Sequence, residues 1–191
     1  MLKMHFLNVG KGNCTVIKFP SGKLALVDID NSKICEDDEV LQCPIDFLDR
    51  EYPKEAIFRF VLTHPDLDHM SGLHELSKKR KIYNFWDTEH DKTVDLDKVH
   101  LGGYDKNDWI AYQRLRQQVS DPKVLRLLQN SATRNYWDED RITVLAPSSR
   151  MIKHAAATGE HNHVSYVIRI EHEGIRILLG GDATRESWKD I

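Results

Sequence analysis

The residues best suited to chemistry form one short motif, His64-x-Asp66-x-Asp68-His69, which places two imidazoles and two carboxylates within six positions. The motif directly follows an apolar run over residues 57–63, a pattern typical of a strand buried on both faces. In an extended loop alternate side chains point the same way, so we expect His64, Asp66 and Asp68 to converge while His69 turns toward a neighbouring point. Two adjacent ligand sets of this kind suit a pair of divalent cations.

The plainer interpretation of this motif is a solvated acidic turn. Pro65 fixes its own φ and restrains His64, which helps to hold such a loop in one shape. A surface turn has no need for histidine at both ends of two carboxylates, so we favour the metal-binding interpretation.

The elements that must position the motif alternate between strand-like and helix-like patterns. Three apolar runs separated by Gly and Pro, over residues 2–9, 14–19 and 24–29, predict an antiparallel meander. Helices are expected after Pro44, around Leu73 and Leu76, and over residues 108–129 with a break near Pro122. Further strands are expected over residues 57–63, 82–86, 142–146, 164–170 and 175–179, and polar loops over 87–108 and 147–163. This order predicts an α/β domain whose sheets pack together inside a helical coat.

Composition limits the class of protein. The 191 residues are 40% hydrophobic and 30% charged with a formal net charge of −3, which predicts one domain over residues 1–191 and argues against a wholly basic nucleic-acid coat. No apolar run approaches bilayer length, and the first residues show no signal peptide. The sparse cysteines, Cys14, Cys35 and Cys43, suit a reducing compartment, so we expect a cytoplasmic protein without a membrane partner. Cys14 is interpreted as a small buried hydrophobic residue.

With its flanking residues, Val61-Leu62-Thr63 before and Ser71-Gly72-Leu73 after, the motif resembles the signature loop of the metallo-β-lactamase superfamily. It is most similar to the branch found in ComEC-type competence proteins, in which Asp replaces the second His of the usual motif. Three more segments agree in the same order. They are residues 6–13, residues 26–30, and residues 162–169 leading to Leu178-Leu179-Gly180-Gly181-Asp182-Ala183.

The resemblance implies an α/β fold of the metallo-β-lactamase-like αββα sandwich type, with two metal ions at one edge between the sheets. It implies that His64 and Asp66 bind the first ion, that Asp68 and His69 bind the second, and that Asp182 bridges both.

Outside these five residues, the resemblance implies supporting roles for several positions. His163 or Asn162 stands where the superfamily has its mid-chain histidine, so His163 is a further candidate ligand and Asn162 a candidate for substrate contact. Asp28 is expected to lie behind the ligands and to orient a ligand imidazole. His161, two positions before His163, is a substitute for a missing ligand because an x-separated pair can point two imidazoles one way.

One departure from the branch concerns the C-terminal end. The family continues past the Gly-Asp-Ala segment into a further helix and strand and then a His-His-Gly-Ser turn with the last ligand, and this sequence ends at Ile191 without that turn. We therefore expect the sandwich to be incomplete there, with a longer polypeptide or a partner chain completing it. Asn8 and Asn13 replace residues that are acidic in the branch.

The activity implied is that of a metal-dependent hydrolase. A pair of divalent ions lowers the pKa of a bridging water, which makes hydroxide available near neutral pH, and neutralises charge on a phosphoryl or carbonyl oxygen. Asp68 is assigned a catalytic role in orienting that hydroxide. Zn²⁺ is expected from the resemblance, with Mn²⁺ as a rival because the ligand set is rich in carboxylate.

By analogy with the branch, the expected reaction is phosphodiester hydrolysis of nucleic acid. Trp109 and Tyr112 are candidates to stack bases, beside basic residues at 78–81 and at Arg114, Arg116, Lys123 and Arg126. Against this, basic helix faces are usually only solvated and aromatics at helical spacing are usually core. Two alternatives stay open: a lactamase-like or thioesterase-like hydrolase of small molecules, and a truncated metal-binding or scaffold subunit completed by a partner.

Overall fold

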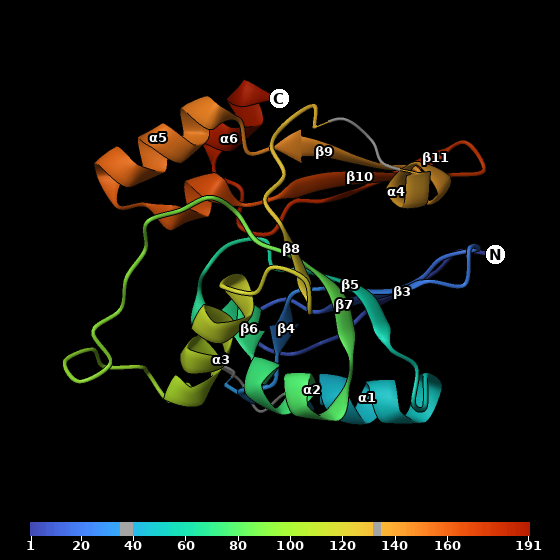
Figure 1. The fold of residues 1–191 in the computed structure, drawn as a ribbon, viewed down its shortest axis with the longest axis horizontal. Helices are drawn as coiled ribbons and strands as arrows, with labels where there is room; N and C mark the ends of the chain where they lie inside the picture. The colour runs from blue at the N-terminus through green and yellow to red at the C-terminus, as the bar shows by residue number, and fades with distance from the viewer. Residues whose placement is uncertain (35–39, 132–134) are drawn as a thin grey trace.

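A six-stranded sheet forms the centre of the protein (Figure 1) in the computed structural model, which describes residues 1–34, 40–131 and 135–191. Cys35 lies outside the described residues. The strands, in their order across the sheet, are β1 (Lys3–Phe6), β2 (Thr15–Lys18), β3 (Leu24–Val27), β5 (Ile57–Val61), β7 (Ile82–Trp86) and β8 (Lys123–Leu125). The first three are antiparallel, which confirms the predicted meander, and β3, β5, β7 and β8 run parallel.

Three helices cover one face of this sheet (Figure 1): α1 (Pro44–Glu51), α2 (Leu73–Lys79) and α3 (Lys106–Arg116). Leu48, Leu76 and Tyr112 from these helices share a core with Phe60 and Phe85 of the sheet. All five side chains are fully buried, and such burial stabilises a fold by about 1.5–3 kcal/mol per large apolar side chain. The helices predicted after Pro44 and around Leu73 and Leu76 are confirmed.

A three-stranded antiparallel sheet, in the order β11-β10-β9, lies beside the first one. It consists of β9 (Ile142–Ala146), β10 (Val167–His172) and β11 (Ile175–Leu179). The predicted hairpin is confirmed, and its two-residue turn has positive φ at both Glu173 (50°) and Gly174 (81°), as the twist of a tight hairpin requires.

A second core joins the two sheets. Val61 and Trp86 of the six-stranded sheet pack with Val144, Ile168 and Leu179 of the three-stranded sheet. The helices α5 (Ser149–Thr158) and α6 (Arg185–Asp190) lie on the opposite side of the molecule from α1, α2 and α3 (Figure 1). The helix α4 (Asn135–Glu139) leads into β9.

Two sequence-based expectations, for residues 108–129 and 147–163, are wrong. The helix predicted over residues 108–129 ends at Arg116, because residues 123–125 instead pair with β7 as an edge strand and Val124 packs against the core. The loop predicted over residues 147–163 contains α5. Its signals were present in the sequence: the Ser148 side chain caps the first turn, accepting from the Met151 N–H, and Gly159 ends the helix with φ of 74°.

Within the described residues, no helix is both long enough and apolar enough to span a bilayer.

Candidate metal centre

The predicted metal loop, residues 64–69, follows the end of β5 at the carboxyl edge of the parallel strands. Its second half is a turn of 3₁₀ helix over Leu67–His69, closed by the His69 N–H donating to the carbonyl of Asp66 at 3.0 Å. The expectation of an extended loop with alternating directions is therefore wrong, because the turn shortens the path between its two histidines. The rings of His64 and His69 have centroids 4.1 Å apart, and both residues are 1% exposed.

Asp182 reaches the same point from the other sheet, just beyond β11. Its Oδ1 lies 3.3 Å from His69 Nε2, and its Oδ2 lies 4.0 Å from His64 Nε2. The ligand atoms of these three residues all lie within 4.8 Å of one another. The carboxylate thus presents one oxygen to each imidazole.

Asp66 and Asp68 each lie beside one of the two imidazoles. Asp66 Oδ2 is 3.8 Å from His64 Nε2, and Asp68 Oδ2 is 3.9 Å from His69 Nε2. The fold therefore gathers the five residues named from the sequence, two from each end of the loop and Asp182 between them.

Asp28 lies behind the two histidines because β3 stops short of the end of the predicted strand. Asp28 has φ of 55°, and the chain then continues as β4 (Ile29–Asp30), which pairs with β6 (Met70–Ser71) instead of with the central sheet. The break turns the Asp28 carboxylate toward the end of β5. Its Oδ1 accepts from the Thr63 N–H at 2.7 Å, and its Oδ2 lies 2.8 Å from His69 Nδ1.

A hydrogen-bond chain through Thr63 fixes the tautomer of the His64 imidazole. The Thr63 hydroxyl donates its one proton to Asp28 Oδ2 at 2.7 Å, so it can only accept from His64 Nδ1, which lies 3.1 Å away. His64 then carries its proton on Nδ1 and a lone pair on Nε2. Among the described residues no group hydrogen-bonds to that buried Nε2. A buried, unpaired ring nitrogen facing two carboxylates is where a cation would complete the donor set.

The charge states of the two histidines differ. Burial, together with the charge of His69, lowers the pKa of His64. Burial also lowers the pKa of His69, but the Asp28 charge and hydrogen bonds to Asp182 and Asp28 outweigh it and raise this pKa to about 11. The hydrogen bond from His69 lowers the pKa of Asp182. Without metal, His64 is therefore neutral, and His69 carries a proton that a cation would have to replace.

Glycines allow the close approach of the segments that carry these groups. A Cβ on Gly181, which has φ of +49°, would lie 2.5 Å from Thr63 Oγ1. A Cβ on Gly12 would lie 1.8 Å from the carbonyl oxygen of Asp68. Gly12 in the turn after β1 therefore packs closely against the metal loop, and Gly181 packs closely against Thr63 just before it, which only residues without a side chain permit.

None of the three residues of the late His-Asn-His segment belongs to the group formed by His64, His69 and Asp182. His163 is buried, with Nδ1 2.7 Å from Thr184 Oγ1 and Nε2 2.9 Å from Glu160. Both of its ring nitrogens thus have partners, and neither belongs to the group formed by His64, His69 and Asp182. His161 Nε2 lies 3.2 Å from Asp91, and Asn162 is partly exposed in the 3₁₀ turn between them.

Lys92, which the sequence did not single out, reaches the centre from the long loop after β7, and its ammonium pairs with Asp66. Tyr104 comes from the same loop. Burial and the charges of Asp68 and Asp30 raise the pKa of Tyr104 to about 12, so its phenol stays neutral. A polar loop predicted to cover a site was the available signal, but which of its side chains would reach inward depends on tertiary structure.

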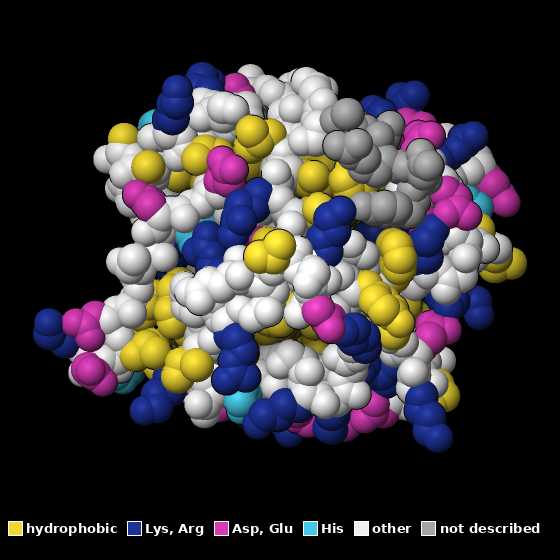
Figure 2. Space-filling view, viewed as in Figure 1, with side chains coloured by type: hydrophobic (Ala, Val, Ile, Leu, Met, Phe, Trp, Pro, Cys, Tyr) yellow, Lys and Arg dark blue, Asp and Glu magenta, His cyan; other side chains and the backbone are white. Residues whose placement is uncertain are grey.

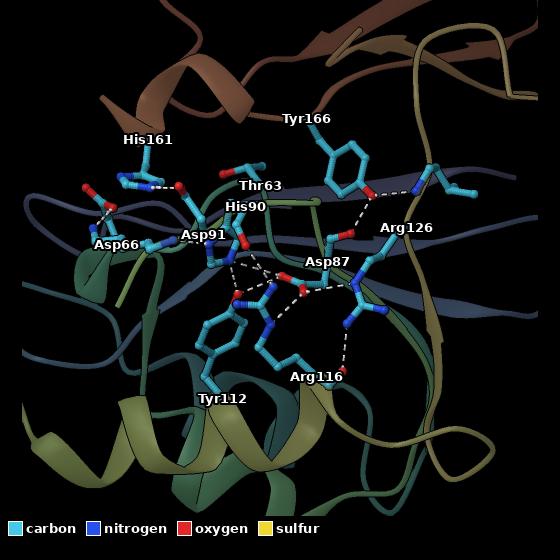
Figure 3. Close-up of polar contacts among 12 residues, drawn as sticks. Thr63, Asp66, Asp87, His90, Asp91, Tyr112, Arg116, Arg126, His161 and Tyr166 are labelled. Atoms are coloured by element: carbon cyan, nitrogen blue, oxygen red, sulfur yellow. Dashed lines mark hydrogen bonds and ion pairs between the residues drawn. The ribbon is translucent and has the colours of Figure 1, made fainter. Parts of the chain in front are cut away.

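A buried polar network anchors the start of this loop (Figure 3). Asp87 Oδ1 accepts from the Tyr112 hydroxyl at 2.7 Å, and its Oδ2 lies 3.1 Å from Arg116 Nε. The Tyr166 hydroxyl donates to the Asp87 carbonyl at 2.9 Å. His90 stacks on Tyr112, and burial and the charge of Arg116 lower the pKa of His90 to about 2.

This network corrects the expected nucleic-acid platform on α3. Tyr112 is 0% exposed and Trp109 is 4% exposed, so these rings form no open stacking surface on the outside of α3. Arg116 is paired with Asp87, and Arg126 Nε lies 3.8 Å from the same carboxylate. The helical spacing of these aromatics reflects the core.

No protein-family model and no curated protein matches the sequence. Among solved structures the chain is similar to Igni18, described as a novel metallo hydrolase from the hyperthermophilic archaeon Ignicoccus hospitalis, with a TM-score of 0.50 and 11% sequence identity. The match covers 96% of this chain and 62% of that one, so this chain spans less than two thirds of the neighbour's length. At this identity the likeness concerns the fold, which supports the mixed α/β class.

Proposed function

We propose that this protein is a metal-dependent hydrolase with a metallo-β-lactamase-like αββα fold, and that the residues around His64, His69 and Asp182 form its metal centre. The observation that carries the proposal is the unpaired, buried Nε2 of His64 facing carboxylates that come from two different sheets. The name of the structural neighbour, a metallo hydrolase, points to the same class of activity.

The donor set fits two divalent ions. His64 and Asp66 would hold one, His69 and Asp68 would hold the other, and Asp182 would be shared, since each of its oxygens faces one imidazole. Imidazole and carboxylate ligands suit Zn²⁺ and Mn²⁺. When bound, such ions supply Lewis-acid activation of the substrate and a water acidic enough to act as a nucleophile near neutral pH.

The protein's own groups then have distinct tasks. Asp28 and Thr63 hold the imidazoles so that both Nε2 atoms point inward. Burial raises the pKa of the Asp68 carboxyl, which favours a role in orienting the attacking water and holding its proton. Lys92, beside Asp66, is placed to contact an anionic oxygen of the substrate.

For the scissile bond we propose a phosphoester, and nucleic acid is one candidate substrate class because of the resemblance to the competence branch. A centre of this charge, with a lysine at its rim, suits a phosphoryl group better than a neutral amide. A small-molecule substrate is the second candidate. It is favoured by a cavity of about 450 Å³ beside Asp66 and Asp68.

Metal content and hydrolysis test the proposal together. Protein reconstituted with Zn²⁺ or Mn²⁺ should hold about two equivalents by elemental analysis and should hydrolyse bis(p-nitrophenyl) phosphate. Asp68→Ala and His69→Ala should abolish this activity while the circular dichroism spectrum is kept, and His172→Ala at the β10–β11 turn should retain it. One equivalent or none, or full activity in Asp68→Ala and His69→Ala, would contradict the proposal and favour a scaffold role. A steep loss of affinity for single-stranded DNA with rising salt would support nucleic acid.

A further inference from the structure

The cavity beside the metal loop has polar and charged groups on one side and apolar side chains on the other. Its volume, about 450 Å³, lies within the range of about 300–1,000 Å³ typical of small-molecule sites. One wall is the metal loop itself, from Pro65 to Asp68, and the opposite wall is the segment from Lys92 to Tyr104. Aliphatic side chains of Val94, Val99 and Leu101 line the second wall.

We propose that this cavity binds an apolar group of the substrate, so that the substrate is a small phosphoester with an alkyl or aryl arm. This inference rests on the proposed function, because it places the scissile phosphoester at the centre formed by His64, His69 and Asp182. The arm would extend from that centre past Asp66 and Asp68 into the cavity.

The apolar lining of the cavity supports an apolar arm. Contact between such an arm and Val94, Val99 and Leu101 removes apolar surface from water, and the rings of Tyr104 and Trp109, which also line the cavity, add flat apolar surface that suits an aryl arm. Figure 2 shows hydrophobic side chains gathered at the left of the molecule, where the segment after β7 extends in Figure 1. Val94, Val99 and Leu101 lie on a loop that neither sheet requires, so packing of the sheets does not explain why they are apolar, whereas contact with an apolar ligand does.

The cations of the cavity support an anionic head group at its metal end. Lys92 pairs with Asp66 at this end, and Lys11 also lines the cavity. With two divalent ions present, four positive charges would face the three carboxylates of Asp66, Asp68 and Asp182, and Lys92 would add another. An amphipathic phosphoester matches both this end and the aliphatic wall.

Four of the groups expected to follow a long nucleic-acid strand are used inside the fold. Trp109 and Tyr112 are buried, and Arg116 and Arg126 face Asp87. Of the two substrate classes, the one with a single compact arm therefore agrees better with the side chains around the site.

A series of alkylphosphonates tests the inference by binding, because the P–C bond resists hydrolysis. Methyl-, butyl- and octylphosphonate would be titrated calorimetrically into metal-free and zinc-loaded protein. Affinity should rise by roughly threefold to fourfold per methylene group for arms that fit, in line with transfer of CH₂ groups out of water. Zinc should raise the affinity for all three ligands without removing this dependence of affinity on chain length.

Matched variants locate the effect. Val99 is 44% exposed, so Val99→Asp should fold normally, and it should flatten the dependence on chain length. Val119→Asp, at a position that is 87% exposed and outside the cavity lining, should leave it intact. Lys92→Gln should lower the affinity for all three ligands about equally, by roughly tenfold, because it removes a contact to the phosphonate group that they share.

The outcomes separate this inference from the proposed function. Three results would overturn the inference. The first is that affinity in the wild-type protein does not depend on chain length, and the second is that Val99→Asp and Val119→Asp reduce this dependence equally. The third is that thymidine monophosphate binds more tightly than octylphosphonate. If the dependence is present but the protein neither binds zinc nor hydrolyses phosphoesters, the cavity assignment stands and the proposed function fails. If the protein cleaves DNA but its affinity for alkylphosphonates does not depend on chain length, the proposed function stands and the cavity assignment fails.

Discussion

His69 Nδ1 lies 2.8 Å from Asp28 Oδ2, although 41 positions separate the two residues in the chain. The contact exists because the strand carrying Asp28 breaks earlier than its apolar pattern indicates, with φ of 55° at Asp28 itself. Both side chains are 1% exposed, so the interaction is shielded from water. It holds the imidazole with Nε2 toward Asp182, the orientation that a metal ligand requires.

Replacing Asp28 by Asn should therefore weaken metal binding without removing a proposed ligand. We expect Asp28→Asn to lower zinc affinity by about 10–100-fold, because the amide no longer supplies the negative charge that makes His69 a strong donor. Competition with a chromogenic chelator measures the change. Asp97→Asn, which alters an exposed carboxylate, serves as the control, and unchanged affinity in Asp28→Asn would contradict the role assigned to this contact.

The same pair predicts how the stability of the metal-free protein depends on pH. The pKa of His69 is raised from 6.5 to about 11 in the folded state, so its protonated form stabilises the fold. This contribution is fully present below about pH 6.5 and is lost as pH rises toward 11. Thermal unfolding in the presence of a chelator should show a melting temperature that falls between about pH 7 and 10, more steeply than in His69→Gln. Parallel curves for the two proteins would rule this out.

Zinc binding should have the opposite dependence on pH. The cation must replace the proton on His69 Nε2, so apparent zinc affinity should increase as pH rises, by about tenfold per unit for one proton released. Calorimetric titrations in two buffers of different ionisation enthalpy would count the protons. Release of no proton at about pH 7 would show that His69 is already neutral there.

Gly181 offers a test of how the Asp182 segment docks. A Cβ at this position would lie 2.5 Å from Thr63 Oγ1, and its φ of +49° disfavours any side chain. Gly181→Ala should cost about 1–3 kcal/mol of stability and should lower zinc affinity, because Asp182 is displaced from the two histidines. Gly159→Ala is matched in conformation, with φ of +74°, and a methyl group there would meet no atom of the described residues within 4 Å. It should destabilise the fold by about 1 kcal/mol while zinc affinity stays the same. Equal zinc affinity in both variants would contradict the docking role.

The sequence identified the donor groups because their types and spacing are local properties. Two histidines and two aspartates in six residues nominated four of the five residues that the fold brings together, and the resemblance to the metallo-β-lactamase superfamily nominated Asp182. The buried strand before the motif, which forms the middle of the parallel sheet, was equally clear from its continuous apolar run.

What the sequence did not reveal depends on contacts between distant segments. Thr63 and Lys92 have no special spacing, and their roles arise only once β3, β5 and the loop after β7 lie side by side. The aromatic residues of α3 were ambiguous for a related reason. Helical spacing is the same for a stacking platform and for a core face, and only the packing of Tyr112 against Phe85 distinguishes them.

The buried network at Asp87 predicts that stability and loop position are linked. Asp87 is 1% exposed and lies 3.1 Å from Arg116 Nε, so Arg116→Met would leave a buried carboxylate short of its main cationic partner. We expect a loss of about 3 kcal/mol in the free energy of unfolding, measured by urea denaturation. Arg114→Met, on the exposed face of the same helix, should change stability by less than about 0.5 kcal/mol.

A second substitution shows whether the unpaired charge causes that loss. Asp87→Asn combined with Arg116→Met removes the carboxylate that Arg116→Met leaves behind, so the double variant should be less destabilised than the sum of the two single changes. Because residues 87–92 lead from this network to Lys92, Arg116→Met should also weaken binding of methylphosphonate, whereas Arg114→Met should not. Strict additivity of the two single variants would mean that Arg116 acts through its packing on the Tyr112 ring, whose centroid lies 5.3 Å from the guanidinium carbon.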